Sequence, residues 1–434
     1  MNILDTLTFI SLMLLCFGSF HFSRLVYGDS LAPLGLFFGV NLASLSLYHL
    51  NLLPLTPVST QAYVLIVISM FSFFWGVMIA FPSFVLNGRP LAIHETFCGR
   101  VEESDGLRLF YYITSFIGIV GWVFYVTAVL PPGWLENLSM LQGNYIFPYH
   151  LGYTIVSSAL VPPTFILLAS ARHKVTLPSV CMLVANIVTM GLCGIKAYLV
   201  LGLATSLLVL SATCPGRIRL RHLAFLVSCL IGFMILYDHF VDVYVPHQFP
   251  GSRFPDVLSL LERPYLYITG PLSAMSVIMA DPPAHEQWGQ ITLLLVWKIL
   301  GPGGLEIMDW RVPEFSPFVD VGASDANVYT LIGGVYWDYS WLGAILICIL
   351  LGLISTKLYV MARKRYNWIL YLFSALFSYG LLISFFTYYY SDVLIFLLFY
   401  AIIVGYISKI ASGVCKWIFA CTSHSQSKKR TDEL

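Results

Sequence analysis

The sequence predicts an all-α polytopic membrane protein of about 11 transmembrane helices, with one large outer loop that contains short interfacial or re-entrant helices. Two features of the composition predict this class: 58% of the 434 residues are hydrophobic and only 10% are charged. Soluble domains carry roughly 25% charged residues. The third observation is that the apolar residues gather in long runs, as segments that cross lipid require.

The apolar runs define the predicted helices, because each is long enough to cross a hydrocarbon core of about 30 Å. They lie near residues 3-20, 32-53, 62-84, 109-130, 152-170, 177-195, 197-213, 223-239, 333-359, 368-387 and 392-411. The first run leads directly into further spans and lacks the pattern of a cleavable signal peptide. We therefore expect it to be the first transmembrane helix.

Basic residues orient these helices, because short cytoplasmic connections are enriched in lysine and arginine. One set of alternate connections, with the C-terminal tail, carries Arg24, Arg89, Arg100, Arg108, Arg172, Lys174, Arg217, Arg219, Arg221, Arg363, Lys364, Arg365, Lys416, Lys428, Lys429 and Arg430. The short connections of the opposite set carry a single basic residue, Lys196. This asymmetry predicts a short N-terminus outside and a C-terminus inside.

The chain is expected to have three parts. Residues 1-238 form an N-terminal transmembrane bundle of about eight spans, residues 239-330 form the large outer loop, and residues 331-434 form about three spans with a cytoplasmic tail. Two apolar stretches of the loop, 264-280 and 291-301, have lengths that suit interfacial or re-entrant helices. A loop this long without structure of its own is uncommon, so we expect a compact outer domain on the membrane.

Several classes of function are disfavoured by what the sequence lacks. It has no phosphate-binding G-x-x-x-x-G-K-[ST] loop, no G-x-G-x-x-G after a strand, and no H-E-x-x-H or D-x-D motif. The nine cysteines include no C-x-x-C pair and none between 230 and 347, so neither a zinc site nor a disulfide framework in the outer loop is expected. A net charge of +1 suggests no nucleic-acid partner.

Four basic residues on the outer side are candidates for binding an anionic group: Lys196 at a tight turn, and Arg253, Arg263 and Arg311 in the large loop. The planar guanidinium suits two-point hydrogen bonding to phosphate or carboxylate. A structural role is the alternative for each. Lys196 can serve as a snorkelling anchor at the membrane edge, and the arginines can pair with acidic residues of the loop.

Asp338 and His239 are candidates for a general base. Asp338 lies among tyrosines and tryptophans in "VYWDYSW", where desolvation is expected to raise its pKa. Tyr329 and Tyr336 accompany it, and aromatic rings beside carboxylates commonly hold sugar rings. The alternatives are an interfacial aromatic belt for the rings and a hydrogen-bonded interfacial side chain for His239.

The stretch "NVYTLIGGVYWDYSWLGAILICILLGLIS" resembles the signature of bacterial oligosaccharide repeat-unit polymerases, the O-antigen polymerases of the Wzy type. In that family an Asn/Thr-Val-Tyr-Thr segment leads to a Tyr-x-Asp-Phe/Tyr-Gly-like segment and a glycine-containing span. The residues that fill this pattern are Asn327, Val328, Tyr329, Thr330, Tyr336, Asp338, Tyr339 and Gly343. The family more often has a glycine straight after the aromatic residue, where this chain has Ser340 and Trp341. "CGIKAYLVL" and "YLYITGPLSAM" are similar to two further segments of the family.

The resemblance implies a glycosyltransferase of the bacterial inner membrane with its active face on the periplasmic side. The growing glycan, linked to undecaprenyl pyrophosphate, is transferred onto a newly flipped lipid-linked repeat unit, without a cofactor or metal. Lys196, Arg253, Arg263 and Arg311 would contact pyrophosphate or glycan phosphate. Asp338 or His239 would act on the acceptor hydroxyl, with Tyr329 and Tyr336 lining the sugar site. The implied partners are membrane lipids, a flippase and a chain-length regulator protein.

Two alternatives stay open. An O-antigen ligase-like enzyme would move the same kind of donor onto a lipid A core and would share the cations and the topology. A lipid-linked oligosaccharide transporter or flippase would need polar residues deep in several spans, whereas the charges outside the loops are few, chiefly Asp5 and Lys196. The motifs around Asp338 favour the polymerase.

Overall fold

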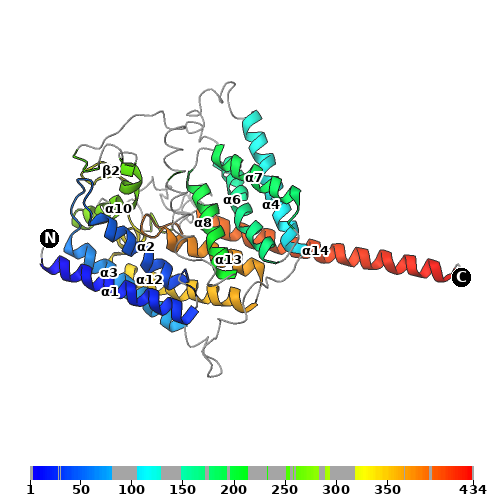
Figure 1. Ribbon diagram of the computed structural model, residues 1–434, viewed down its shortest axis with the longest axis horizontal. Coiled ribbons are helices and arrows are strands. Elements are labelled where there is room, and N and C mark those ends of the chain that lie inside the picture. The colour runs from blue at the N-terminus through cyan, green and yellow to red at the C-terminus, as the bar shows by residue number, and fades with distance from the viewer. Residues whose placement is uncertain are drawn as a thin grey trace, which may run out of the picture. The chain divides into compact units, whose positions relative to one another are not determined.

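The computed structural model describes residues 3–27, 29, 31–80, 105–128, 148–171, 175–192, 196–213, 232, 251–254, 258, 261–282, 289–293, 318–365, 367–390 and 393–432. The helices among them are α1 (Ile3–Tyr27), α2 (Pro33–Tyr48), α3 (Thr60–Ala80), α4 (Asp105–Ala128), α6 (Pro148–Ser170), α7 (Leu177–Leu192), α8 (Lys196–Thr213), α10 (Glu262–Ala280), α12 (Leu331–Arg365), α13 (Trp368–Leu382) and α14 (Val393–Asp432). One short antiparallel ladder joins β1 (Val319–Asp320) to β2 (Asp325–Ala326). The described residues are therefore mostly helical (Figure 1).

Four helices of the described part are long and apolar enough to cross a membrane, namely Thr60–Ala80, Asp105–Thr127, Leu331–Arg365 and Leu397–Trp417. Shorter apolar helices accompany them, including Pro33–Tyr48 and Leu177–Leu192. An all-α membrane protein is thus confirmed as the fold class. The total of 11 spans stays a prediction, because the predicted span 223-239 lies almost wholly outside the described residues.

The chain divides into two compact units. Unit 1 comprises Met1–Cys98, Cys214–Lys364 and Ser374–Phe396, and unit 2 comprises Gly99–Thr213, Arg365–Phe373 and Leu397–Leu434. Both units draw on early and late parts of the sequence. The boundaries after residues 98, 213 and 364 fall at connections between apolar runs, whereas those after residues 373 and 396 fall within runs.

In unit 1, glycines set the closest crossing of helices α3 and α12. A Cβ atom placed on Gly352 would overlap the carbonyl oxygen of Phe73, and one placed on Gly76 would overlap the carbonyl oxygen of Ile349. Small residues at helix crossings let backbones approach, which supplies packing in lipid where no hydrophobic effect drives association. The two glycines therefore specify where these helices cross.

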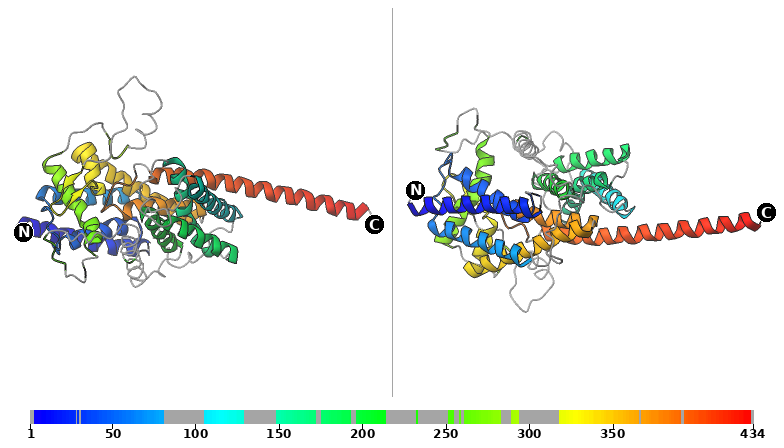
Figure 2. Two further views of the ribbon diagram at one scale, coloured as in Figure 1. Left: turned by 90° about the horizontal axis from the view of Figure 1, so that it is seen from above. Right: turned by 60° about the horizontal axis from the view of Figure 1, so that its bottom comes forward.

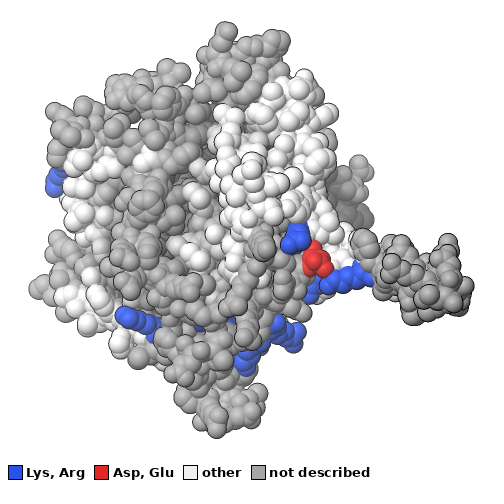
Figure 3. Space-filling view, turned by 45° about the vertical axis from the view of Figure 1, so that its right-hand side comes forward, with Lys and Arg blue, Asp and Glu red and all other residues white. Residues whose placement is uncertain are grey.

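Helix α12 presents an apolar face outward as well as inward. Leu342, Leu346 and Leu350, spaced four residues apart, are 66%, 52% and 51% exposed. The opposite face, which includes Cys348 and Ser355, is buried. In the view of Figure 3, few charged side chains lie on the described surface. An apolar exposed stripe on a long helix is what contact with lipid requires.

The loop between α2 and α3 is fixed by side chains of α10. The hydroxyl of Ser273 donates to the carbonyl of Thr56 at 2.8 Å, and the peptide N–H of Ser59 donates to the hydroxyl of Ser276 at 2.7 Å. The N–H of Thr56 also bonds the carbonyl of Val321 beside the ladder, at 2.8 Å. The predicted outer stretch 264-280 is thus a helix packed into unit 1. Of the stretch 291-301, only residues 291–293 are described.

Unit 2 is a bundle of α4, α6, α7 and α8 with the first residues of α13 and most of α14. The hydroxyls of Ser157 and Tyr400 lie 3.2 Å apart between α6 and α14. Lys416 forms an ion pair of 3.0 Å with Asp105, which joins α14 to the first turn of α4. Both views of Figure 2 show α14 continuing as one helix past the rest of this unit.

Candidate functional site at the start of helix α12

Thr330 caps α12 and fixes where it begins. Its hydroxyl accepts a hydrogen bond of 3.0 Å from the N–H of Gly333, the third residue of the helix, as an N-cap threonine does. The N–H of Leu331 donates to the carbonyl of Ser384 at 2.7 Å. The hydroxyl of Ser384 in turn accepts from the buried amide of Asn41 at 2.9 Å. The start of α12 is therefore held against the turn after α13 and against α2.

The glycine pair that follows lets three segments approach α12. A Cβ atom on Gly333 would lie 2.8 Å from Cγ of Met275 in α10. One on Gly334 would lie 3.3 Å from Ile291 and 3.5 Å from Tyr388. The first turn of α12 therefore lies where α10, the 289–293 segment and the connection after α13 meet.

Asp338 holds the 289–293 segment to α12. Its side chain is 6% exposed. One carboxylate oxygen accepts the N–H of Thr292 at 2.7 Å, and both oxygens lie within 3.3 Å of the N–H of Ile291. Peptide donors aimed at a carboxylate favour its charged form. In this arrangement the aspartate is buried and already engaged with backbone.

Tyr339 and Tyr388, which were not among the predicted site residues, complete this polar cluster. The hydroxyl of Thr292 donates to the hydroxyl oxygen of Tyr339 at 2.5 Å. Burial, with smaller contributions from Tyr339 and Asp338, raises the pKa of Tyr388 well above its usual value. Tyr388 therefore keeps its proton at neutral pH. Its sequence signal is the run "YYYSD", in which three tyrosines occupy a predicted outer connection.

Helix α12 is broken at Ser340. This residue has φ 60° and ψ −160°, a backbone conformation that is essentially restricted to glycine. Beyond the break, a Cβ atom on Gly343 would overlap Cβ of Tyr339, so the glycine leaves room for that side chain. The rings of Tyr336 and Trp341 pack edge to face across the break, with centroids 5.8 Å apart. The residues before Ser340 thus form a short helix of their own.

Tyr329 and Tyr336 have different surroundings. Tyr329 is 2% exposed and packs with Ala274, Ile278 and Trp337 in the core between α10 and α12. Burial raises its pKa well above the usual value for tyrosine. Tyr336 is partly exposed. Of the two predicted sugar-binding tyrosines, Tyr336 alone offers an accessible ring in this structure.

Arg253 and Arg263 lie near the first turn of α10. Arg253 is exposed, and its guanidinium has no ion-pair or hydrogen-bond partner among the described residues. Its backbone is fixed by an N–H bond of 2.8 Å to the carbonyl of Leu52. Arg263 is half-buried, twelve residues before Met275, which corresponds to about 18 Å along a helix. Both arginines are thus roughly one helix length from the start of α12.

The remaining predicted site residues are not brought into this cluster by the described structure. His239 and Arg311 lie outside the described residues. Lys196 is the first residue of α8, in unit 2, and its side chain is outside the described set. The described cluster therefore combines one predicted base, Asp338, with Thr292, Tyr339 and Tyr388. Tyr336 lies on the same helix and packs on Trp341.

The chemistry available in this cluster is hydrogen bonding by hydroxyls around one carboxylate, next to partly exposed aromatic rings. Among the described residues, no group of three or more histidines, cysteines, aspartates and glutamates lies close enough to hold a metal ion. Protein-family models, curated proteins and solved structures were each compared with the chain, and none of them matches it.

Proposed function

We propose that this chain is a membrane glycosyltransferase that polymerises oligosaccharide repeat units linked to undecaprenyl pyrophosphate, at the periplasmic face of the bacterial inner membrane. The acceptor hydroxyl attacks the anomeric carbon of the growing glycan. A new C–O glycosidic bond forms, and the C–O bond to pyrophosphate breaks. The hydroxyl proton passes to a base, and the lipid pyrophosphate leaves. The donor is already activated, so the reaction needs no nucleotide.

The observation that carries the proposal is the break at Ser340. The resemblance places a glycine at this position in the family, and the backbone here has a conformation that glycine adopts readily and other residues rarely do. The mismatch between this chain and the family pattern, at Ser340 and Trp341, therefore includes a site where the backbone still has the geometry for glycine. This supports a shared local structure, in which a short polar helix precedes the membrane-crossing part of α12.

Asp338 is assigned a positioning role in this proposal. Its oxygens already accept the peptide N–H groups of Ile291 and Thr292, so it is poorly placed to take a proton from a substrate. It fixes the 289–293 segment and, through Thr292, the hydroxyl of Tyr339. The role of base at the acceptor hydroxyl passes to His239, the other predicted candidate.

The arginines of the α10 corner are assigned to the acceptor's pyrophosphate. An acceptor repeat unit keeps its own pyrophosphate at the end opposite the reacting hydroxyl. A cation that binds this pyrophosphate should therefore lie about one repeat unit away from the site where the new bond forms. Arg253 is exposed, and the corner lies about 18 Å along α10 from the start of α12. Charge-assisted hydrogen bonds from guanidinium would hold that phosphate.

The test uses the purified full chain in liposomes with a synthetic polyprenyl-pyrophosphate-linked repeat unit and no nucleotide. A ladder of lengthened lipid-linked glycans, with one polyprenyl pyrophosphate released per bond formed, is the expected result. A single transfer onto added lipid A core, without a ladder, would indicate a ligase. Movement of the substrate across the bilayer with no new bond would indicate a flippase, and either result refutes the polymerase.

Arg253→Ala tests the assignment of the cations within the same assay. It is expected to raise the acceptor concentration needed for half-maximal rate about tenfold, the effect of losing one charge-assisted hydrogen bond. Arg365→Ala is the matched control, because Arg365 is also exposed but ends α12 on the predicted cytoplasmic side. Equal behaviour of the two variants would remove Arg253 from the site.

A further inference from the structure

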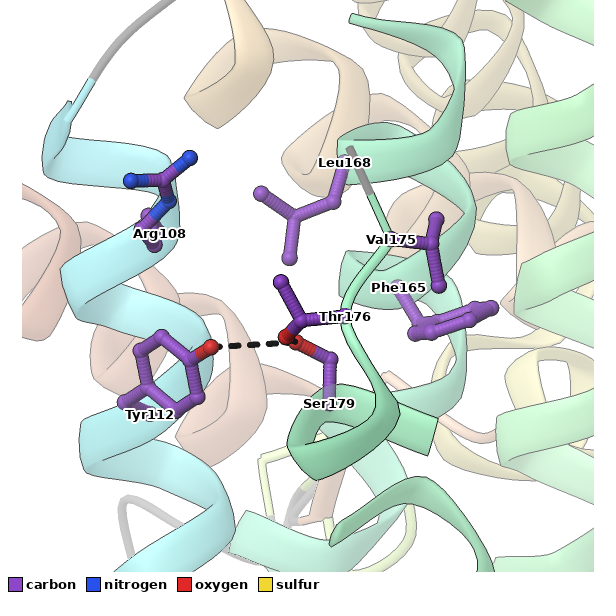
Figure 4. A pocket seen from close by; sticks show the side chains of 7 residues that line it. All are labelled: Arg108, Tyr112, Phe165, Leu168, Val175, Thr176 and Ser179. Carbon is purple, nitrogen blue, oxygen red and sulfur yellow. Dashed lines mark hydrogen bonds between the residues drawn. The ribbon is translucent and has the colours of Figure 1, made fainter. Parts of the chain in front are cut away.

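Unit 2 contains a pocket that the proposed glycan site does not use. Its volume is about 320 Å³, within the range of roughly 300 to 1,000 Å³ typical of ligand pockets. The lining residues are Arg108, Tyr112, Phe165, Leu168, Val175, Thr176 and Ser179. They come from the first turns of α4, the end of α6, the two residues before α7 and the first turn of α7 (Figure 4).

One wall of the pocket is a chain of three hydroxyls. The hydroxyls of Tyr112 and Ser179 lie 3.0 Å apart, and those of Ser179 and Thr176 lie 2.9 Å apart. Three hydroxyls carry three protons, and the two contacts use two of them. Within the described contacts, one proton is left to donate to an acceptor in the pocket. These three hydroxyls together can therefore donate to an anionic or carbonyl oxygen of a ligand.

The cation beside these hydroxyls is Arg108. It lies four residues before Tyr112, hence one turn away on the same face of α4, and it is exposed. Figure 4 shows its side chain one turn from Tyr112 on the pocket wall. The nearby Asp105 is engaged by Lys416 at 3.0 Å.

The opposite wall is apolar, formed by Phe165, Leu168 and Val175 (Figure 4). A pocket with a guanidinium and hydroxyls on one side and hydrocarbon on the other matches a molecule that carries a phosphate next to an acyl chain. The basic residues place this end of α4, α6 and α7 on the predicted cytoplasmic side. Basic pockets between helices on that side commonly bind anionic lipid headgroups.

We propose that this pocket binds the headgroup phosphate of an anionic phospholipid from the cytoplasmic leaflet. Arg108 and the hydroxyls of Tyr112, Thr176 and Ser179 hold the phosphate, and the first part of an acyl chain lies on the apolar wall. The site is separate from the polar cluster at the start of α12. It depends only on the membrane location and the predicted orientation of the chain, and the polymerase activity can fail without affecting it.

The test measures lipid binding by the purified full chain in detergent. Phosphatidylglycerol is titrated in, and both the unfolding temperature and the lipid-bound fraction in native mass spectrometry are recorded. A lipid that binds only the folded protein raises the unfolding temperature with its concentration. We expect phosphatidylglycerol to do so and phosphatidylcholine at the same concentration to have a much smaller effect.

Three variants locate the site. Arg108→Ala is expected to need about tenfold more phosphatidylglycerol for the same stabilisation, because one charge-assisted contact is lost. Tyr112→Phe, which keeps the ring and removes the hydroxyl, should show a smaller shift in the same direction. Arg365→Ala, an exposed arginine of unit 2 outside the pocket, should behave like the unchanged protein.

Two results would overturn the proposal. One is an Arg108→Ala protein, folded as judged by its unfolding transition without lipid, that binds phosphatidylglycerol as tightly as the unchanged chain. The other is that glycerol phosphate alone, at millimolar concentration, gives the full stabilisation and displaces the lipid. The ligand would then be a free phosphate compound instead of a membrane lipid.

Discussion

Two residues at the start of α12 decide the shape of the candidate site. Asp338 accepts hydrogen bonds from the peptides of Ile291 and Thr292, and Ser340 holds the backbone at φ 60°. The first brings a segment 46 residues earlier in the chain against the helix. The second turns the helix direction immediately after "YWDY". Both residues act by fixing the backbone. Substitutions can distinguish this structural role from direct participation in the reaction.

Substitutions of Asp338 separate positioning from proton transfer. Asp338→Asn is expected to keep most of the polymerisation rate, because its amide oxygen can still accept the N–H of Thr292. Asp338→Ala leaves buried peptide donors without an acceptor, which costs about 1 to 3 kcal/mol of stability. The measurements are the initial rate of ladder formation and the unfolding temperature of the same preparations.

A general base would give the opposite pattern. Asp338→Asn would then lower the rate about 10²- to 10⁴-fold, the usual contribution of such a group, and would change the pH dependence of the rate. We expect that loss from His239→Gln instead. Rates measured between pH 5 and 9 for the two variants therefore decide which residue takes the proton.

Ser340→Gly is expected to stabilise the protein. Serine at this φ and ψ lowers the stability of the folded protein by roughly 1 to 3 kcal/mol, and glycine removes this cost. The greater freedom of glycine in the unfolded chain offsets about 0.5 to 1 kcal/mol of the stabilisation. Ser355→Gly is the matched control, because Ser355 lies in the regular part of the same helix. It should lower the unfolding temperature, and a fall in both variants would show that position 340 does not favour glycine.

At the scale of elements, apolar run length predicts where helices lie, but their packing depends on single residues within each run. Helices cover most of the predicted runs in the described part of the chain, but residues 49–53 and 383–387 lie beyond the ends of α2 and α13. The run 333-359 contains no proline that would predict a break in the helix. The break at Ser340 therefore has no clear signal in the sequence. The pairing of 289–293 with Asp338 likewise depends on contacts between distant residues. A local pattern carries no information on such contacts.

The α3–α12 crossing gives a prediction of this kind. Gly352→Ala is expected to lower the free energy of unfolding by about 1 to 3 kcal/mol, because its Cβ would meet the carbonyl oxygen of Phe73. Gly39→Ala in α2, where nothing lies within 4 Å of the added atom, should be neutral or stabilising, since alanine favours helix. Chemical unfolding in detergent measures both, and equal effects would mean that the crossing is not tight.

At the scale of the whole molecule, the distribution of charge predicts an orientation but not the role of each basic residue. Arg363 counts as a cytoplasmic charge in the sequence, but it is 2% exposed. Its guanidinium donates at 2.8 Å both to the carbonyl of Tyr27 and to the hydroxyl of Tyr359. Tyr359 in turn donates to Asp29 at 2.7 Å. The count of basic residues in each connection uses only the sign of the charge. The burial of Arg363 depends on how α1 and α12 pack.

The orientation of the chain decides both proposals together, because the glycan site must face out and the lipid pocket must face in. Leu258, 45% exposed, belongs to the predicted outer loop, and exposed Arg365 lies at the predicted inner end of α12. In a chain whose native cysteines are replaced by serine, Leu258→Cys is expected to react with a membrane-impermeant maleimide in intact spheroplasts. Arg365→Cys should react only after the membrane is opened, since a charged reagent cannot cross the hydrocarbon core. Labelling in the reverse order would put the arginines of the α10 corner in the cytoplasm, away from lipid-linked glycans, and would move the pocket of Arg108 to the outer leaflet.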